Sequence, residues 1–239
     1  IETLTKSERI FLPVVNYEQN IRTNLKILKD KYYVIDFALI KKSVGKSVLK
    51  TNKEIIFVFV GTLYEKIREP FRMLDFFSKA NFAYKIELFY ITEQVIENQL
   101  QDYKKKFGDK LNLHANSSKE SCDIGINTAD IIINIGNKIS NQIPSKIFEL
   151  ISSGKPIINF YYINDDTSKK VLEDYPLKLN VNLMSRNLDY GIFESFCKKS
   201  RGKHIPFEEI TKKYKSSEKV AIEFIEEVRR IYERRTDKK

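Results

Sequence analysis

The sequence predicts an α/β fold with a doubly wound parallel sheet, and three observations support this prediction. Residues 55–60, 131–135 and 157–161 are almost wholly apolar runs, as is typical of strands buried on both faces. Three further strand-like runs, 85–91, 111–114 and 177–181, bring the expected number of strands to six. Segments with helical spacing alternate with these strands, and such alternation produces a parallel sheet with right-handed crossovers.

The first 52 residues do not start like a domain. Residues 9–15 and 32–37 have the composition of short strands, and residues 17–31 between them have a helical pattern. Residues 41–53 are polar and basic, contain Gly45 and show no periodicity, so we expect a linker there.

The main domain begins with the strand 55–60, which ends at Gly61 and Thr62. Ligands gather at the carboxyl ends of parallel strands, and Gly61 allows close approach of the backbone to a ligand. We expect helices over 65–79, over 92–106 with Thr92 as N-cap, and over 117–127. His114 ends the strand 111–114. We interpret it as structural, with contact to a nucleobase as the alternative.

Residues 128–161 are the segment around which we expect the domain to be organised. The apolar strand 131–135 is followed by a polar loop, 136–142, and by Pro144, which suits a first helical turn. The helical pattern runs from Lys146 to residue 152, and Gly154 is a natural residue to end it. The strand 157–161 completes the unit.

Four further helices are expected in the rest of the chain. Residues 165–175 and 188–199 have helical patterns on either side of the strand 177–181, and a short helix follows Pro206. Residues 216–235 predict a long amphipathic helix with one apolar face.

The start of the helix after Pro144 has a chemical consequence. The first N–H groups of a helix are unpaired and carry partial positive charge, so an anion is favoured there. Ser145 adds a hydroxyl and Lys146 a full charge at that end. Glu149, one turn further on, is placed to accept hydrogen bonds from the two hydroxyls of a ribose. The pattern indicates a nucleoside diphosphate site. The alternative is a surface ion pair between Lys146 and Glu149.

The stretch PSKIFELISSGKP, residues 144–156, resembles the signature of sugar-nucleotide glycosyltransferases of the GT-B fold. In that family it belongs to the C-terminal, Rossmann-like donor domain. The resemblance implies that Glu149 holds the donor ribose and that Ser145 and Lys146 lie at the phosphates. It also implies that the preceding loop holds the diphosphate, with the candidates Gly136, Asn137, Asn141 and Ile143.

The sequence departs from the family pattern at two places. Many retaining members carry a second acid eight residues before the ribose acid, where this chain has Asn141, which cannot carry charge. Members often carry Arg and Lys after the glycine that corresponds to Gly61, but Thr62 occupies the usual Arg position. Lys66 and Arg68 are therefore the candidates for gripping the diphosphate. The alternative for both is a surface base on the helix 65–79.

The resemblance also implies a division of the chain. Residues 1–52 would be the closing elements of an N-terminal, acceptor-binding domain with the linker, and residues 53–215 the nucleotide-sugar-binding domain. Residues 216–239 would form a C-terminal amphipathic, basic helix. The alternative for the N-terminal segment is an extra strand and helix docked onto a single domain.

Composition excludes several classes of protein. Apolar residues at 42% and aromatic residues at 12% are enough for a core, which argues against disorder. Two cysteines, Cys122 and Cys197, and two histidines indicate neither a disulfide framework nor a structural zinc site. No apolar run approaches the roughly 20 residues that span a bilayer, and there is no signal-peptide pattern. We therefore expect a cytoplasmic protein.

The net charge of +10 is concentrated at the C-terminal end. Residues 198–239 hold fourteen Lys or Arg against eight Asp or Glu. Such a segment is either a solvated helix face or a surface for an anionic membrane or nucleic acid. No nucleic-acid-binding signature accompanies it, and the absence of a GxGxxG motif argues against NAD.

Three functions remain at the level of sequence. The first is the donor half of a metal-independent glycosyltransferase, which takes a UDP or GDP type sugar as substrate, uses no cofactor and serves a saccharide or lipid-linked acceptor. The second is a non-catalytic partner or chaperone subunit of an active transferase, which Thr62 and Asn141 favour. The third is a protein that meets a membrane surface or nucleic acid through its basic C-terminus, and peripheral membrane contact is compatible with the first.

Overall fold

The computed structural model of the chain describes residues 7, 9–12, 31–41, 54–140 and 142–236. The chain forms two compact units. The larger contains residues 42–210, and the smaller joins residues 1–41 with residues 211–239. The predicted helix at 17–31 and the predicted linker at 41–53 lie outside the described residues, apart from Lys31 and Lys41.

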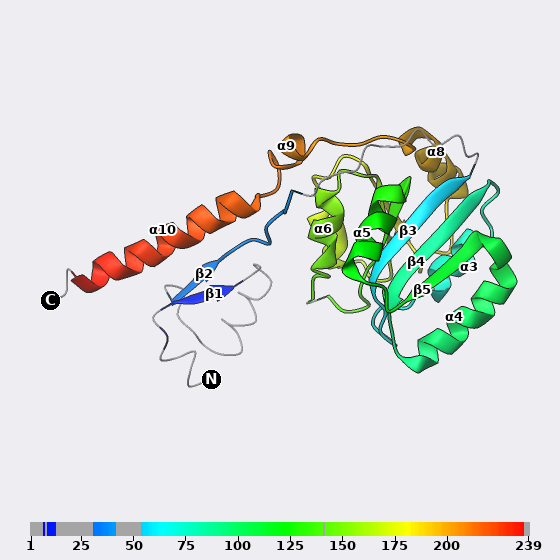
Figure 1. Cartoon of the computed structure of the whole chain (residues 1–239), viewed down its shortest axis with the longest axis horizontal. Helices are drawn as coiled ribbons and strands as arrows, with labels where there is room; N and C mark the ends of the chain where they lie inside the picture. Colours follow the sequence, from blue (N-terminus) through cyan, green and yellow to red (C-terminus); the bar gives the residue numbers. More distant parts are fainter. Residues whose placement is uncertain (1–6, 8, 13–30, 42–53, 141, 237–239) are drawn as a thin grey trace. The chain divides into compact units, whose positions relative to one another are not determined.

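The larger unit is built on a six-stranded, fully parallel sheet with the strand order β5-β4-β3-β6-β7-β8 (Figure 1). The strands are β3 (Ile55–Thr62), β4 (Tyr84–Ile91), β5 (Leu111–Ala115), β6 (Ile131–Ile135), β7 (Ile157–Tyr161) and β8 (Lys178–Asn182). Within this sheet the chain enters at β3, continues through β4 to the edge strand β5, and then crosses back to β6 on the other side of β3. The gap between the ends of β3 and β6 is therefore the switch point of a doubly wound sheet, where ligands bind in this class of fold.

Helices cover both faces of this sheet (Figure 1). The helices of this unit are α3 (Phe71–Phe77), α4 (Gln94–Phe107), α5 (Lys119–Thr128), α6 (Lys146–Ser152), α7 (Thr167–Val171), α8 (Tyr190–Ser200) and α9 (Phe207–Ile210), with a short 3₁₀ turn, η2 (Gly108–Lys110). Helix α9 packs against α6. The core on one face joins α3, α4 and α8 to the sheet through fully buried aromatic side chains such as Phe57, Phe77 and Phe193. Packing of these rings holds the strands rigidly enough to position the loops at their ends.

The predicted doubly wound α/β sheet is confirmed, and each of the six strands agrees with its prediction to within two residues. Gly154 follows α6 at a φ of +70°, as a residue that ends a helix often does. The strands are recognisable in the sequence because a strand such as β6 is buried along its whole length. Its side chains must therefore be apolar, or polar with hydrogen-bond partners inside the protein.

The predicted helix over 65–79 is wrong over residues 65–70, since α3 begins only at Phe71. Tyr64 and Arg68 instead exchange two backbone hydrogen bonds, of 3.0 and 2.9 Å, and Lys66 between them has a φ of +63°. Pro70 explains the difference, because proline disfavours helical geometry in the residue before it and provides no N–H. The candidate bases Lys66 and Arg68 therefore lie on a tight turn.

The predicted N-cap at Thr92 is also wrong. Helix α4 begins at Gln94, and Glu93 occupies the N-cap position. The hydroxyl of Thr92 donates instead to the carbonyl oxygen of Leu63 at 3.2 Å. This bond ties the end of β4 to the end of β3, and such a long-range partner is not visible in the local sequence.

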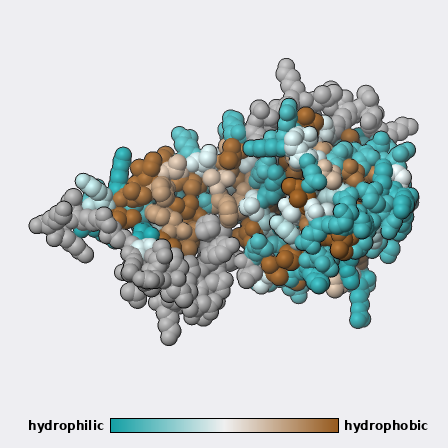
Figure 2. Space-filling view, turned by 60° about the horizontal axis from the view of Figure 1, so that its bottom comes forward, coloured by the Kyte–Doolittle hydropathy of each residue, from teal (hydrophilic) through white to brown (hydrophobic). Residues whose placement is uncertain are grey.

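The smaller unit contains a parallel pair of short strands, β1 (Ile10–Leu12) and β2 (Tyr32–Val34), and the long helix α10 (Ser217–Thr236). The rings of Phe11 and Phe224 approach to 4.7 Å, and Arg9 forms an ion pair with the buried Glu227. The helix also leaves large side chains exposed, namely Ile222, Phe224, Ile225, Val228 and Tyr232. Figure 2 shows hydrophobic residues, in brown, on the surface of the chain. Among the described residues, no helix combines the length and apolarity needed to cross a bilayer.

Candidate functional site

A pocket of about 470 Å³ opens at the switch point of the sheet. Its walls come from the ends of β3 and β4, the turn after β3, the start of α5, and the loop that leads into α6. Binding sites for small molecules commonly measure 300–1,000 Å³, so the pocket is large enough for a nucleotide. Among its lining residues, Arg68, Lys146 and Glu149 carry charge.

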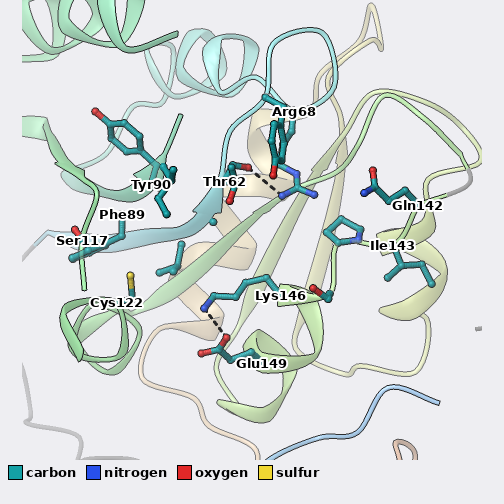
Figure 3. Close-up of a pocket in the computed structure, with 16 residues that line it drawn as sticks. Thr62, Arg68, Phe89, Tyr90, Ser117, Cys122, Gln142, Ile143, Lys146 and Glu149 are labelled. Carbon is teal, nitrogen blue, oxygen red and sulfur yellow. Dashed lines mark hydrogen bonds and ion pairs between the residues drawn. The ribbon is translucent and has the colours of Figure 1, made fainter. Parts of the chain in front are cut away.

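The two ends of the pocket differ in chemistry. Figure 3 shows Phe89, Ser117 and Cys122 on one side, Arg68, Gln142 and Ile143 on the other, and Lys146 between them. The first side offers an aromatic ring, a thiol and a hydroxyl, whereas the second offers a guanidinium. A ligand with a planar apolar part and an anionic part would match this polarity.

The apolar side is held in place by packing beneath it. The ring of Phe89 stacks on His114 with centroids 4.3 Å apart, and Nε2 of His114 lies 2.7 Å from Oε2 of Glu87. On α5, a Cβ added to Gly125 would lie 2.5 Å from the ring of Phe89, so only glycine fits there. His114 thus supports a pocket residue and is not itself part of the lining.

The cationic side is anchored through Asn137. Nε and Nη2 of Arg68 donate to Oδ1 of Asn137 at 2.9 and 2.7 Å, and Nη1 donates to the carbonyl oxygen of Thr62 at 3.2 Å. Burial lowers the pKa of Arg68 from its ordinary value. Because an arginine stays protonated in proteins, the pocket keeps a fixed positive charge.

Further contacts join the turn after β3 to the loop after β6. The N–H of Lys138 donates to the carbonyl oxygen of Ile67 at 2.8 Å, and the ammonium of Lys138 pairs with Glu69. Burial alone would raise the pKa of Glu69, but hydrogen bonds from Lys138 and from the N–H of Lys66 outweigh it and lower that pKa. The hydroxyl of Tyr162 donates to the carbonyl oxygen of Glu69. The two walls of the pocket are therefore tied together.

A buried polar network lies beneath the loop after β6. Asn134, Asn159 and Asn180 lie opposite one another on β6, β7 and β8, and their amides are hydrogen-bonded in series at 2.7 and 3.0 Å. Asn159 also donates to Asp166, which caps α7 by accepting from the N–H of Lys169 at 2.7 Å. Burial raises the pKa of Asp166. Oδ2 of Asp166 would lie 2.2 Å from a Cβ on Gly136, so this glycine makes room for the carboxylate.

On α6, the ammonium of Lys146 lies 2.6 Å from Oε2 of Glu149, and both side chains line the pocket. Ser145 occupies the N-cap position of α6, but its hydroxyl makes no capping hydrogen bond. Lys146 and Glu149 thus combine the ion pair that the sequence offered as an alternative with a position in the pocket.

The structure brings most of the predicted site residues together. Seven of them line the pocket: Gly61, Thr62, Arg68, Ile143, Ser145, Lys146 and Glu149. Four lie outside the lining: Lys66, which is exposed, and the partly or fully buried His114, Gly136 and Asn137. Asn141 lies outside the described residues. Within the described part of the chain, no three His, Cys, Asp or Glu residues are grouped as metal ligands.

Sequence reasoning missed the lining residues that β4 and α5 supply. From β4 and the region of α5 these are Phe89, Tyr90, Ile91, Ser117 and Cys122. It also missed four lining residues from other segments: Val60, Tyr64, Gln142 and Pro144. One signal was available: parallel strands end at the same edge of a sheet, so the end of β4 had to lie beside Gly61. The pairing of Gly61 with Tyr90 shows this proximity.

No protein-family profile matches the chain, and no curated protein matches it by sequence. Solved structures do resemble it. A glycosyltransferase from Rickettsia africae aligns with a TM-score of 0.72 at 12% identity over 95% of this chain and 64% of its own. A sucrose-phosphate synthase from Thermosynechococcus elongatus gives 0.68 at 12% identity over 96% and 60%. Anabaena HepE, in complex with UDP and glucose, gives 0.66 at 9% identity over 92% and 63%.

These neighbours define the fold of the chain. The six-stranded parallel sheet and its helices have the GT-B type of fold that the resemblance at residues 144–156 implied. The chain spans about three-fifths of the length of the structures that it matches.

Proposed function

We propose that this chain is the donor-binding part of a sugar-nucleotide glycosyltransferase, with a nucleoside diphosphate sugar of the UDP or GDP type as its substrate. The observation that carries the proposal is the polarity of the pocket at the switch point, which pairs an aromatic side with a fixed guanidinium. The GT-B fold of the chain and the UDP bound in one structural neighbour support the same class of ligand.

In this proposal each side of the pocket takes one part of the donor. The base lies against Phe89, the ribose hydroxyls donate to Glu149, and the diphosphate lies between Arg68 and Lys146. Ser145 adds a hydroxyl at the same end. Preorganised cations of this kind stabilise negative charge as it develops on a departing diphosphate, so the proposed transfer relies on side-chain charge in place of a metal ion.

Calorimetric titration of the chain with UDP, GDP and their sugar conjugates tests the proposal. We expect binding of one nucleotide series, lost in large part in Glu149→Ala. The proposed acceptor is a saccharide or a lipid-linked saccharide, and this donor-binding part is not proposed to bind it. Little turnover is therefore expected from the chain alone.

Failure to bind any nucleotide would refute the proposal. It would leave the GT-B fold in place and favour the second sequence-based hypothesis, a non-catalytic partner of an active transferase, because such a partner does not need a donor.

A further inference from the structure

The anchoring of Arg68 is unusual because its partners are neutral. Three of the guanidinium hydrogen bonds end on an amide oxygen and a backbone carbonyl, and among the described residues no carboxylate pairs with it. Partly buried arginines are commonly held by carboxylates, which cancel their charge. Asp166 interacts with the charge of Arg68 only at longer range. Arg68 is therefore fixed in place while its charge stays largely uncompensated.

Asn137 itself is held from behind. Its side chain is buried, with 1% of the residue exposed, and its Nδ2 donates to the backbone oxygen and to Oε1 of Gln142, both at 3.3 Å. The backbone oxygen of Gln142 also accepts from the hydroxyl of Thr167 at 2.8 Å. These contacts fix the orientation of the amide, because the reverse orientation would turn its N–H groups toward the N–H groups of Arg68.

We propose that Asn137 is a positioning residue, whose neutral carboxamide holds the guanidinium of Arg68 in the pocket and leaves its charge for the diphosphate of the donor. This inference rests on the proposed function and deepens it. It assigns the grip on the diphosphate to Arg68 on the turn and gives no such part to Lys66, whose side chain is exposed outside the pocket lining. In this proposal Arg68, held by Asn137, takes the part for which the sequence had offered both Lys66 and Arg68.

The distinguishing variant is Asn137→Asp, which keeps an acceptor oxygen beside Arg68, loses the N–H groups that donate to Gln142 and adds the charge that the native residue lacks. Affinity for the preferred nucleoside diphosphate should fall roughly ten- to hundredfold, as expected when a charged hydrogen bond to the ligand is lost. Affinity for the matching nucleoside, followed by NMR titration, should stay within about twofold of wild type, since the nucleoside has no phosphate.

A double-mutant cycle distinguishes an effect that acts through Arg68 from a general loss of structure. In the Arg68→Ala background, Asn137→Asp should cause no further loss of diphosphate affinity, because a positioning residue acts only through its partner. Asn98→Asp, on the exposed face of α4, is the matched control for adding one negative charge and should bind as wild type does.

Two results would overturn the inference about Asn137 without contradicting the proposed donor site. One is undiminished diphosphate affinity in Asn137→Asp, and the other is a parallel loss of nucleoside affinity, which would indicate a distorted pocket. If the wild-type chain bound no nucleotide at all, both the proposed function and this inference would fail, so the wild-type titration separates the two failures.

Discussion

The ammonium of Lys146 lies 2.6 Å from the carboxylate of Glu149, one turn further along α6, and both side chains face the pocket. The two groups are 30% and 24% exposed, so solvent screens their attraction and leaves the pair of modest stability. In the proposed donor complex, Glu149 would turn toward the ribose and Lys146 toward the phosphates, and the loss of their mutual attraction would cost little.

Replacement of Glu149 by alanine should weaken nucleotide binding by about 1.5–3 kcal/mol, the value of a hydrogen bond to a charged group. The expected change is at least tenfold in the dissociation constant measured by calorimetry. Glu209→Ala, on an exposed position of α9, is the control for removing a carboxylate and should leave the affinity unchanged. Equal affinity of Glu149→Ala and wild type would exclude a ribose role for Glu149.

The effects of Lys146→Ala and Glu149→Ala on nucleotide affinity should not add. Removal of Lys146 alone takes the ammonium away from the carboxylate of Glu149, so the negative charge of Glu149 repels the diphosphate more strongly. Removal of both groups relieves that repulsion, so the double variant should lose less affinity than the sum of the single losses. Four titrations measure this coupling. Strict additivity would show that the ion pair has no influence on the ligand.

The strands β3, β6 and β7 were predictable because burial on both faces demands an apolar sequence, whatever their partners are. The helices were less predictable at their starts. Pro70 and Thr92 both occur in segments with helical spacing, yet one breaks the helix before it and the other bonds to Leu63 across the sheet. The start of α4 thus depends on a contact that the local pattern does not contain, whereas the start of α3 follows from a local residue, Pro70.

The candidate site likewise contains residues that could be predicted from the sequence and residues that could not. Residues on α6 were predictable, because their spacing in sequence equals their spacing on one helix. The contact between Asn137 and Arg68 was not predictable, since the two residues lie 69 positions apart in the sequence. Phe89 was missed for a similar reason: its place in the pocket comes from the sheet, which sets the end of β4 beside the end of β3.

Gly136→Ala should destabilise the fold by about 1–3 kcal/mol, the usual cost of overpacking a buried site. The added Cβ would lie 2.2 Å from Oδ2 of Asp166, which cannot move freely because its carboxylate caps α7. Urea unfolding of the variant and the wild type measures the loss.

Two companion variants make this measurement specific. Gly191→Ala, on an exposed position of α8 where the nearest atom lies at 3.3 Å, is the control for the intrinsic effect of the substitution. In the Gly136→Ala background, Asp166→Ser should recover part of the loss, because the shorter side chain keeps an oxygen for the cap and removes the overlap. A loss that Asp166→Ser leaves unchanged would contradict a steric cause.

Asp166→Asn should change the pH dependence of stability. Burial raises the pKa of Asp166 above its ordinary value of 3.8, so the native state holds the proton more tightly than the unfolded state does. Wild-type stability therefore decreases as pH rises from the unfolded pKa to the native pKa of this group, by at most about 1.4 kcal/mol per pH unit. Asparagine has no proton to release and keeps an oxygen for the N–H of Lys169.

The free energy of unfolding of Asp166→Asn, minus that of wild type, should consequently rise as pH increases from about 4 and become constant above the native pKa of Asp166. Urea unfolding at half-unit steps from pH 4 to pH 8 measures the difference. Asp165→Asn, where the native carboxyl is 63% exposed, is the control for removing one negative charge near α7. A flat difference would show that hydrogen bonds to the carboxylate balance the penalty of its burial, and a difference that falls with rising pH would show that they exceed it; either result would contradict a raised pKa.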